Sequence, residues 1–254
     1  MIRVGRCAYD KAGRRVDPPV PEGFVSVVVL MKSHSKWGVL GPYELRDARG
    51  RILENVWQFS KVYSSVPASR QVKSRYDSTV IWDHPAETHV DATTGALLPA
   101  YARWRTKGMH APTAVRYPVG FSARHACLYS LTDTGVAAAG HPQLDYIQAR
   151  KHIYAPMYQE LVRAQPLFRE LVAMVARGVN VLIVEVDGPH QESLAHYQAT
   201  YGVDESFIQG SSMAATAENL DIMLNDALHP YGHGYCLARA LLQEKEGSPS
   251  VTLG

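Results

Sequence analysis

The sequence has few cysteines and no long apolar run, and both features exclude classes of protein. Only 3 of its 254 residues are cysteine, they stand far apart, and no C-x-x-C pair occurs. A zinc knuckle, a redox dithiol and a small disulfide-stapled scaffold are therefore not expected, and spare thiols are typical of a reducing cytoplasm. The longest apolar run, residues 27–31, is far shorter than the roughly 20 residues that a membrane helix needs.

The chain also lacks targeting and nucleotide-loop motifs. Residues 1–10 carry Arg3 and Arg6 but no apolar stretch of signal-peptide length, so we expect a cytoplasmic protein that does not bind a membrane. No G-x-S-x-G and no Gly-Lys-Ser/Thr occur, which leaves a serine hydrolase and a P-loop enzyme without support. With 46% hydrophobic and 20% charged residues, the composition is that of an ordinary globular protein.

The apolar pattern predicts an α+β fold, a mostly helical single domain with a small sheet. We expect an N-terminal extension over residues 1–23, the domain over 24–245 and a C-terminal tail over 246–254. Prolines and glycines should restrict residues 65–125 to loops and short pieces. Strands are expected at 24–31 and, centrally, at 180–186; helices are expected at 54–64, 144–163 (bent or split at Pro156), 165–177, 191–201, 214–224 and 234–243.

Charge is distributed unevenly along the chain. Residues 61–125 contain nine Lys or Arg and four acids, whereas residues 178–238 contain eight acids and no Lys or Arg. In the basic region, Arg103 and Arg105 flank Trp104, a combination that can hold phosphates and stack on a base. The alternative is a solvated surface with one structural ion-pair interface to the acidic half.

One expected helix carries chemistry-bearing residues on a single face. Glu54, Gln58 and Lys61 stand at i, i+4 and i+7, with Trp57 beside them at i+3. An acid, an amide, a cation and an aromatic ring then project together. The alternative is an ordinary amphipathic helix whose N-terminal Glu interacts with the helix dipole.

Other polar groups allow two interpretations each. The glycines of Gly232-His233-Gly234 can bring backbone amides to an anion, or can merely let two elements pack closely. Asp187, which shares a strand face with Glu185, can open onto a site or form the turn with Gly188. Asp226 is a weaker candidate acid. His84 and His89, five residues apart around Pro85, do not have the spacing of a metal site, so we expect no metal.

The helix residues carry a family resemblance. Glu54-x-x-Trp57-Gln58-x-x-Lys61 resembles the E-x-x-aromatic-Q-x-x-K helix signature of the NADAR family of N-glycosidases, which are related to NAD and ADP-ribose metabolism. Leu40-Gly41-Pro42-Tyr43 stands where that family has L-S-N-F, and Tyr231-Gly232-His233-Gly234 stands where it has a W-G-x-G-like element before a closing helix.

The resemblance implies a NADAR-like fold and hydrolysis of the N-glycosidic bond of an ADP-ribose-type or phosphorylated nucleoside or ribosylamine, without a cofactor. Glu54 would stabilise the oxocarbenium-like ribose or activate water, and Lys61 would hold a phosphate or protonate the departing nitrogen. Asp187 is a second candidate acid. The substrate-binding candidates are Trp57, Gln58, Arg103, Trp104, Arg105, Tyr231, Gly232 and Gly234.

Two alternatives stay open. A non-enzymatic nucleic-acid-binding protein would use the basic aromatic region 61–125, and a glycosyl or ADP-ribosyl transferase would use the same pocket as the N-glycosidase. The expected partner is a nucleotide-like small molecule or ADP-ribosylated nucleic acid. The sequence leaves the oligomeric state undetermined.

Overall fold

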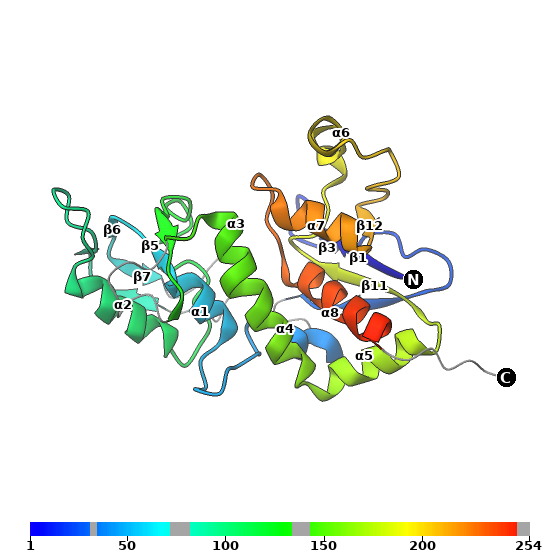
Figure 1. The fold of residues 1–254 in the computed structure, drawn as a ribbon, viewed down its shortest axis with the longest axis horizontal. Coiled ribbons are helices and arrows are strands. Elements are labelled where there is room, and N and C mark those ends of the chain that lie inside the picture. Colours follow the sequence, from blue (N-terminus) through cyan, green and yellow to red (C-terminus); the bar gives the residue numbers. More distant parts are fainter. Residues whose placement is uncertain (31–34, 72–81, 134–142, 248–254) are drawn as a thin grey trace. The chain divides into compact units, whose positions relative to one another are not determined.

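The computed structural model describes residues 1–30, 35–71, 82–133 and 143–247. The chain forms two compact units. The two-segment unit combines Met1–Gly41 with Tyr158–Gly254, and the continuous unit is Pro42–Met157. Both helices and strands in several small sheets are present, as expected for the α+β class (Figure 1). The single domain predicted over residues 24–245 spans parts of both units and stays a prediction.

The two-segment unit is built on a four-stranded sheet of order β12-β1-β11-β4 (Figure 1). β11 (Asn180–Glu185) pairs in parallel with β1 (Ile2–Arg6) on one side and with β4 (Phe24–Val28) on the other. β12 (Ser212–Ala214) pairs antiparallel with β1. The apolar run of β11 is buried from its second to its last residue, because an interior parallel strand is covered on both faces.

Helices cover this sheet and position the ends of its strands. α8 (His233–Gly247) packs against β1, β11 and α5 (Pro166–Ala176). Gly178, just after α5, takes a positive φ of 84°, which lets the chain turn directly into β11. The other elements of this unit are β2 (Ala8–Tyr9), β3 (Arg15–Val16), the 3₁₀ turns η1 (Lys36–Leu40) and η4 (Gln191–Ser193), α6 (Leu194–Tyr201) and α7 (Ala217–Asn225).

The continuous unit packs two helices around an aromatic core. Phe59 of α1 (Leu53–Phe59) and Trp104 of α2 (Pro99–Met109) are fully buried, with ring centroids 4.6 Å apart. Gly108 permits this approach, since a Cβ at that position would lie 2.0 Å from the Phe59 ring. Short antiparallel pairs complete the unit: β10 (Tyr129–Ser130) with β5 (Lys61–Val62), β6 (Ser65–Val66) with β9 (Glu87–Thr88), and β7 (Ser69–Gln71) with β8 (Trp82–His84).

The helix expected over residues 144–163 is split into three segments. α3 (Tyr146–Ala149) leads into a π-helical segment, η3 (Arg150–Tyr154), and then into α4 (Ala155–Arg163). Pro156 follows just after the π-helical segment and has no N–H to donate to the turn before it. The wider π-helical turn before it accommodates the change in hydrogen-bond pattern. The point in the sequence where one unit ends and the other begins lies within α4.

Three expectations from the sequence differ from the structure. The segment 1–23 is not an extension, because it begins with β1, an interior strand whose Val4 is fully buried. The region 65–125 does contain a long element, the 11-residue helix α2, which starts at Pro99 because proline is well tolerated at a helix N-terminus. The helix expected over 54–64 ends at Phe59, and Lys61 begins β5.

Most of the remaining predicted elements appear with shifted ends. The expected strand at 24–31 ends as β4 at Val28, although residues 31–34 lie outside the described part of the chain. The tail expected over 246–254 lies largely outside it as well. No helix among the described residues is both long and apolar enough to span a bilayer.

Candidate functional site

Three polar side chains of the continuous unit form a hydrogen-bonded relay. Gln58 Nε2 donates to Glu54 Oε1 at 2.8 Å, and Lys61 Nζ donates to Gln58 Oε1 at 3.0 Å. Glu54 and Gln58 are one helical turn apart on α1, and both are buried. Although Lys61 is on β5 rather than on the helix, its long side chain still reaches the amide. The structure therefore brings together the three residues that the helix pattern singled out.

Burial and charge act in opposite directions on Lys61. Removal from water lowers the pKa of its ammonium below the usual value, and the negative charge of Glu54 raises it in part. The same ammonium lies 4.9 Å from the ring centroid of Trp57. An amine with a lowered pKa next to a carboxylate can exchange a proton more readily near neutral pH than an ordinary lysine.

Aromatic rings surround the outer end of the relay. The Trp57 ring lies 5.2 Å from Tyr154 and 6.4 Å from Tyr146, centroid to centroid. Trp57 is half-buried and Tyr146 is 45% exposed, so solvent reaches this side of the relay. The guanidinium of buried Arg150 stacks 4.0 Å from the Tyr146 ring. A planar base and an anion would both find suitable neighbours here.

The three residues expected to clamp phosphates on α2 do different things. Trp104 is fully buried in the aromatic core, so it offers no face to a base. The Arg105 guanidinium donates inward to the carbonyls of Leu131 and Thr132 and to the Tyr101 hydroxyl. Trp104 and Arg105 therefore do not have the ligand-binding roles that the sequence suggests, because the packing of α2 turns both side chains into the core. Arg103 is exposed on the other face of the helix.

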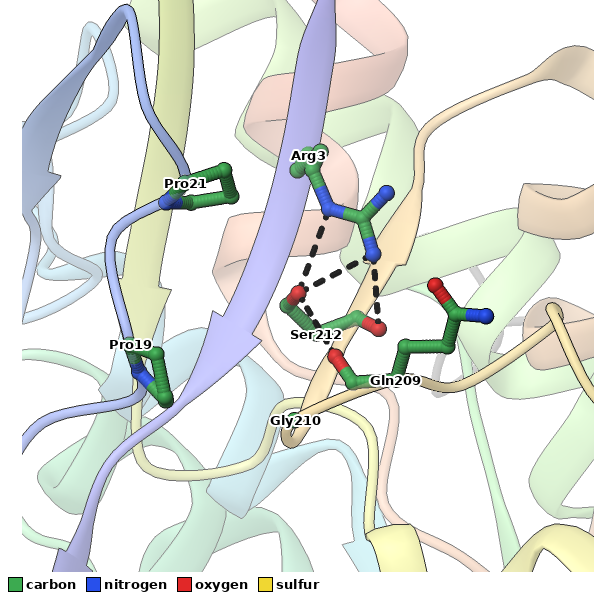
Figure 2. Close-up of a pocket in the computed structure, with 6 residues that line it drawn as sticks. All are labelled: Arg3, Pro19, Pro21, Gln209, Gly210 and Ser212. Carbon is green, nitrogen blue, oxygen red and sulfur yellow. Dashed lines mark hydrogen bonds between the residues drawn. The ribbon is translucent and has the colours of Figure 1, made fainter.

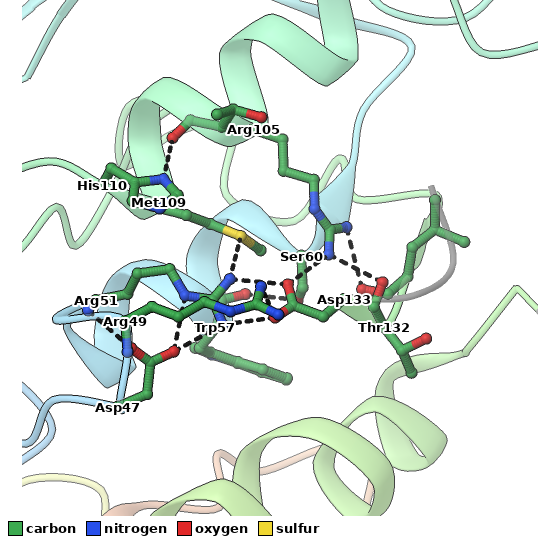
Figure 3. Close-up of polar contacts among 12 residues, drawn as sticks. Asp47, Arg49, Arg51, Trp57, Ser60, Arg105, Met109, His110, Thr132 and Asp133 are labelled. Atoms are coloured by element: carbon green, nitrogen blue, oxygen red, sulfur yellow. Dashed lines mark hydrogen bonds and ion pairs between the residues drawn. The ribbon is translucent and has the colours of Figure 1, made fainter. Parts of the chain in front are cut away.

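A network of arginines and aspartates locks the start of α1 to the segment after β10 (Figure 3). Arg51 binds both oxygens of Asp133 through two nitrogens, with Nη1 to Oδ1 at 3.0 Å, and its Nε donates to Asp47 at 2.7 Å. Arg105 Nη2 lies 3.5 Å from Asp133. No sequence motif predicts this network, since Arg51 and Asp133 are 82 positions apart. It fixes the base of the helix that carries Glu54.

The two histidines near Pro85 contact one acid. The Nε2 atoms of His84 and His89 lie 3.7 and 3.8 Å from Glu87 Oε2. β8 ends at His84 and β9 begins at Glu87, so the intervening turn brings both rings to the same carboxylate. His89 is fully buried, and burial lowers its pKa.

The remaining candidate residues belong to the two-segment unit, where Glu185 is the central group. This last residue of β11 is 1% exposed, and its carboxyl fills the space next to Gly232 and Gly234. A Cβ at Gly232 would lie 2.1 Å from Glu185 Oε2, and one at Gly234 would lie 2.8 Å from Oε1. The two glycines therefore permit close approach of the Glu185 side chain.

Burial, with the nearby charge of Asp187, raises the pKa of Glu185 to about 8. His233 Nδ1 lies 3.3 Å from Glu185 Oε2, while its Nε2–H points to the Val29 carbonyl. Since a carbonyl only accepts hydrogen bonds, Nδ1 is left to accept from a protonated Glu185 carboxyl. Asp187 follows β11 in the turn, half-buried. Tyr231 is buried and stacks on Tyr235 with ring centroids 5.1 Å apart.

A shallow pocket of about 350 Å³ lies on the same unit (Figure 2). Its one charged lining residue is Arg3, whose guanidinium already donates to the hydroxyl and carbonyl of Ser212 at 3.1–3.2 Å. Pro19, Pro21 and Gly210 add no titratable group. The pocket lacks the convergent polar atoms of a catalytic centre.

The candidate residues thus fall into two groups. Glu54, Trp57, Gln58 and Lys61 are in mutual contact within the continuous unit. The other group, in the two-segment unit, is Tyr231, Gly232, Gly234 and Asp187 around Glu185. Sequence reasoning named Glu185 only as a neighbour of Asp187, although its place at the end of an apolar central strand marks it as a buried acid.

Comparisons with known proteins identify no family. No protein-family model, no curated protein and no solved structure matches the chain.

Proposed function

We propose that this chain is an N-glycosidase with a NADAR-like fold, and that it hydrolyses the N-glycosidic bond of an ADP-ribose-type or phosphorylated nucleoside substrate. The observation that carries the proposal is the relay of Glu54, Gln58 and Lys61. It holds a carboxylate and a partly desolvated amine in fixed geometry, beside the half-buried ring of Trp57.

The reaction needs a negative charge near the anomeric carbon. As the bond from C1′ to the nitrogen breaks, positive charge develops on the ribose, and a carboxylate stabilises it or removes a proton from the attacking water. Glu54 takes this role. Gln58 is a positioning residue, because its amide donates to Glu54 Oε1 and fixes the carboxylate on the helix.

A purine base or a ribosylamine nitrogen leaves with a proton, and Lys61 is the group to supply it; nicotinamide leaves NAD as a neutral ring and needs none. Burial lowers the pKa of the Lys61 ammonium, so proton transfer from it is easier than from an exposed lysine. Water adds its hydroxyl to C1′, and its proton ends on the leaving nitrogen or, with NAD, in solvent, which balances the hydrolysis. Trp57 and Tyr146 offer rings on which a base can stack. The roles suggested for Tyr231, Gly232, Gly234 and Asp187 stay predictions.

A product assay with one matched pair of variants tests the proposal. The purified chain is incubated with NAD, with ADP-ribosylated guanosine and with a ribosylamine phosphate, and free base and sugar are measured by chromatography and mass spectrometry. Glu54→Gln keeps an oxygen that can accept from Gln58 but removes the charge, and should slow release about 10²–10⁴-fold. Glu44→Gln removes an exposed carboxylate of the same unit and should leave the rate unchanged.

The outcomes are distinct. No release from any of the three substrates, or release by Glu54→Gln at the rate of the unmodified chain, would overturn the proposal. Transfer of the sugar to an added base or amino acid, in place of hydrolysis, would identify a transferase that uses the same carboxylate.

A further inference from the structure

A second group of polar side chains gathers in the two-segment unit. It consists of His196 on α6 and of Asp226 and His229 in the segment after α7. One ligand atom from each of the three lies within 4.8 Å of the other two. Among the residues that the structure describes, this is the one set of three or more His, Cys, Asp or Glu with such geometry.

The spacing within this group suits a single small cation. His196 Nε2 lies 3.3 Å from Asp226 Oδ1, and His229 Nδ1 is hydrogen-bonded to Asp226 Oδ2. Two ligands of a tetrahedral Zn²⁺, each about 2.0–2.2 Å from the ion, are about 3.3–3.5 Å apart. The distance from His196 to Asp226 therefore already equals the edge of a zinc tetrahedron. Because the two histidines face different oxygens of Asp226, the carboxylate would bind the ion through both oxygens or turn one toward it, with a small outward movement of the His229 ring.

Neighbouring groups hold two of the three ligands, His196 and Asp226, in place. Thr200 Oγ1 lies 3.3 Å from His196 Nδ1, so the ring nitrogen that faces away from Asp226 has its own partner. The Leu228 N–H donates to Asp226 Oδ1 at 3.1 Å. Metal-binding histidines characteristically use their second nitrogen in this way, which orients the ring and leaves the other nitrogen for the ion.

Burial around the group is graded from inside to outside. The Asp226 side chain is 2% exposed, whereas those of His196 and His229 are 26% and 19% exposed. The ring of fully buried Tyr197 lies 5.2 Å from each imidazole ring and forms the inner wall. An ion held here would have protein ligands on its inner side and solvent on its outer side.

We propose that His196, Asp226 and His229 form a binding site for Zn²⁺ or a similar divalent first-row cation, with water in the remaining coordination position. Two imidazoles and one carboxylate are a ligand set that suits zinc, and an open position is typical of sites that activate water or take an external ligand. The ion takes the place of the proton between His229 and Asp226, and that proton passes to solvent. This site is independent of the N-glycosidase proposal.

Metal titration of the full chain tests the site directly. The protein is stripped with a chelator, dialysed, and titrated with ZnCl₂ in a calorimeter; Co²⁺ serves as a spectroscopic probe, because its visible absorption is strong only in four- or five-coordinate sites. We expect one equivalent bound. His229→Gln and Asp226→Asn, chosen to preserve size, should each weaken binding at least tenfold. His125→Ala, which removes an exposed histidine elsewhere, should not change it.

A measurement on the unmodified chain guards against misfolded variants. The imidazole NMR signals of His196 and His229 should shift most on addition of one equivalent of Zn²⁺, and that of His190 should shift less, because its ring lies 5.9 Å from that of His229; the other eight should stay in place. No saturable binding by the unmodified chain would overturn the proposal, and the three residues would then be a hydrogen-bonded His–Asp–His cluster. Equal binding by His229→Gln, or shifts of other histidines, would overturn it too.

Discussion

The buried acid at the end of β11 should make the stability of the two-segment unit depend on pH. Glu185 has an ordinary pKa of 4.5 in the unfolded chain, and burial raises it to about 8 in the folded one. Between these values the folded state binds a proton that the unfolded state has lost. The free energy of unfolding therefore falls as the pH rises: this contribution is fully present below pH 4.5 and is lost by about pH 8.

The size of this effect follows from the shift. Each unit of pKa difference corresponds to about 1.4 kcal/mol, so a shift from 4.5 to about 8 corresponds to about 5 kcal/mol in total. A typical domain is stable by only about 5–15 kcal/mol. Ionisation of one carboxyl should thus remove a large part of the stability of this unit.

Glu185→Gln isolates the contribution from those of other titrating groups. The amide cannot ionise, and it can still donate to His233 Nδ1, 3.3 Å from the carboxyl oxygen that it replaces. Urea unfolding, followed by circular dichroism and by hydrogen exchange of residues 180–185, is measured from pH 5 to 9. The free energy of unfolding of the variant, relative to that of the unmodified chain, should rise by about 1.4 kcal/mol per pH unit up to about pH 8.

The matched control is Glu160→Gln, which removes an exposed carboxylate from α4. Its stability should follow that of the unmodified chain at every pH. If the curves of Glu185→Gln and the unmodified chain instead run parallel from pH 5 to 9, the carboxyl is not buried in the folded state as described.

Two further changes test the packing of the continuous unit. Gly108→Ala places a Cβ 2.0 Å from the Phe59 ring and should lower the free energy of unfolding by about 3 kcal/mol. Gly95→Ala is the control and should lower it by about 1 kcal/mol, because a φ of +69° strains the backbone there but nothing lies within 4 Å. Equal shifts of the two variants in the urea midpoint would contradict the contact between Gly108 and Phe59. Asp133→Asn should cost about 1–2 kcal/mol at pH 7 by weakening the partner of buried Arg51. Because Arg51 lowers the pKa of Asp133, the stabilisation that this ion pair provides is present above pH 3.8 and is lost as the pH falls through the lower native pKa. The variant should not show this loss of stability in acid.

The sequence predicted best where one residue pattern alone decides the structure. The strand β11 was predicted with nearly correct ends because four successive apolar residues flanked by turn signals fit only a covered strand. β1 was missed because Arg3 and Gly5 interrupt its apolar pattern. Position 5 leaves no room for a side chain, since a Cβ there would lie 2.8 Å from the Pro18 ring. The need for glycine therefore comes from a residue outside the strand.

In the candidate sites, too, contacts between near neighbours in the sequence could be predicted, and contacts that depend on packing of distant residues could not. The contacts among Glu54, Gln58 and Lys61 could be predicted because they join residues only three and four positions apart, even though Lys61 lies on β5 and not on the expected helix. The inward turn of Trp104 depends on how α2 packs on α1, which no local pattern contains. The set of His196, Asp226 and His229 joins His196 to two residues that lie thirty or more positions further along the chain, and the sequence singles out only Asp226 of the three, as a weak candidate acid.

The order of strands in the four-stranded sheet has a consequence for synthesis of the chain. β1 and β4 emerge first, yet neither pairs with the other, because β11 lies between them. About 150 residues separate Val28 from Asn180, so at about 5–20 residues per second the early strands wait roughly 8–30 s for their partner. During translation two apolar segments remain unpaired beside a growing polypeptide, which makes them natural clients for chaperones at the ribosome exit.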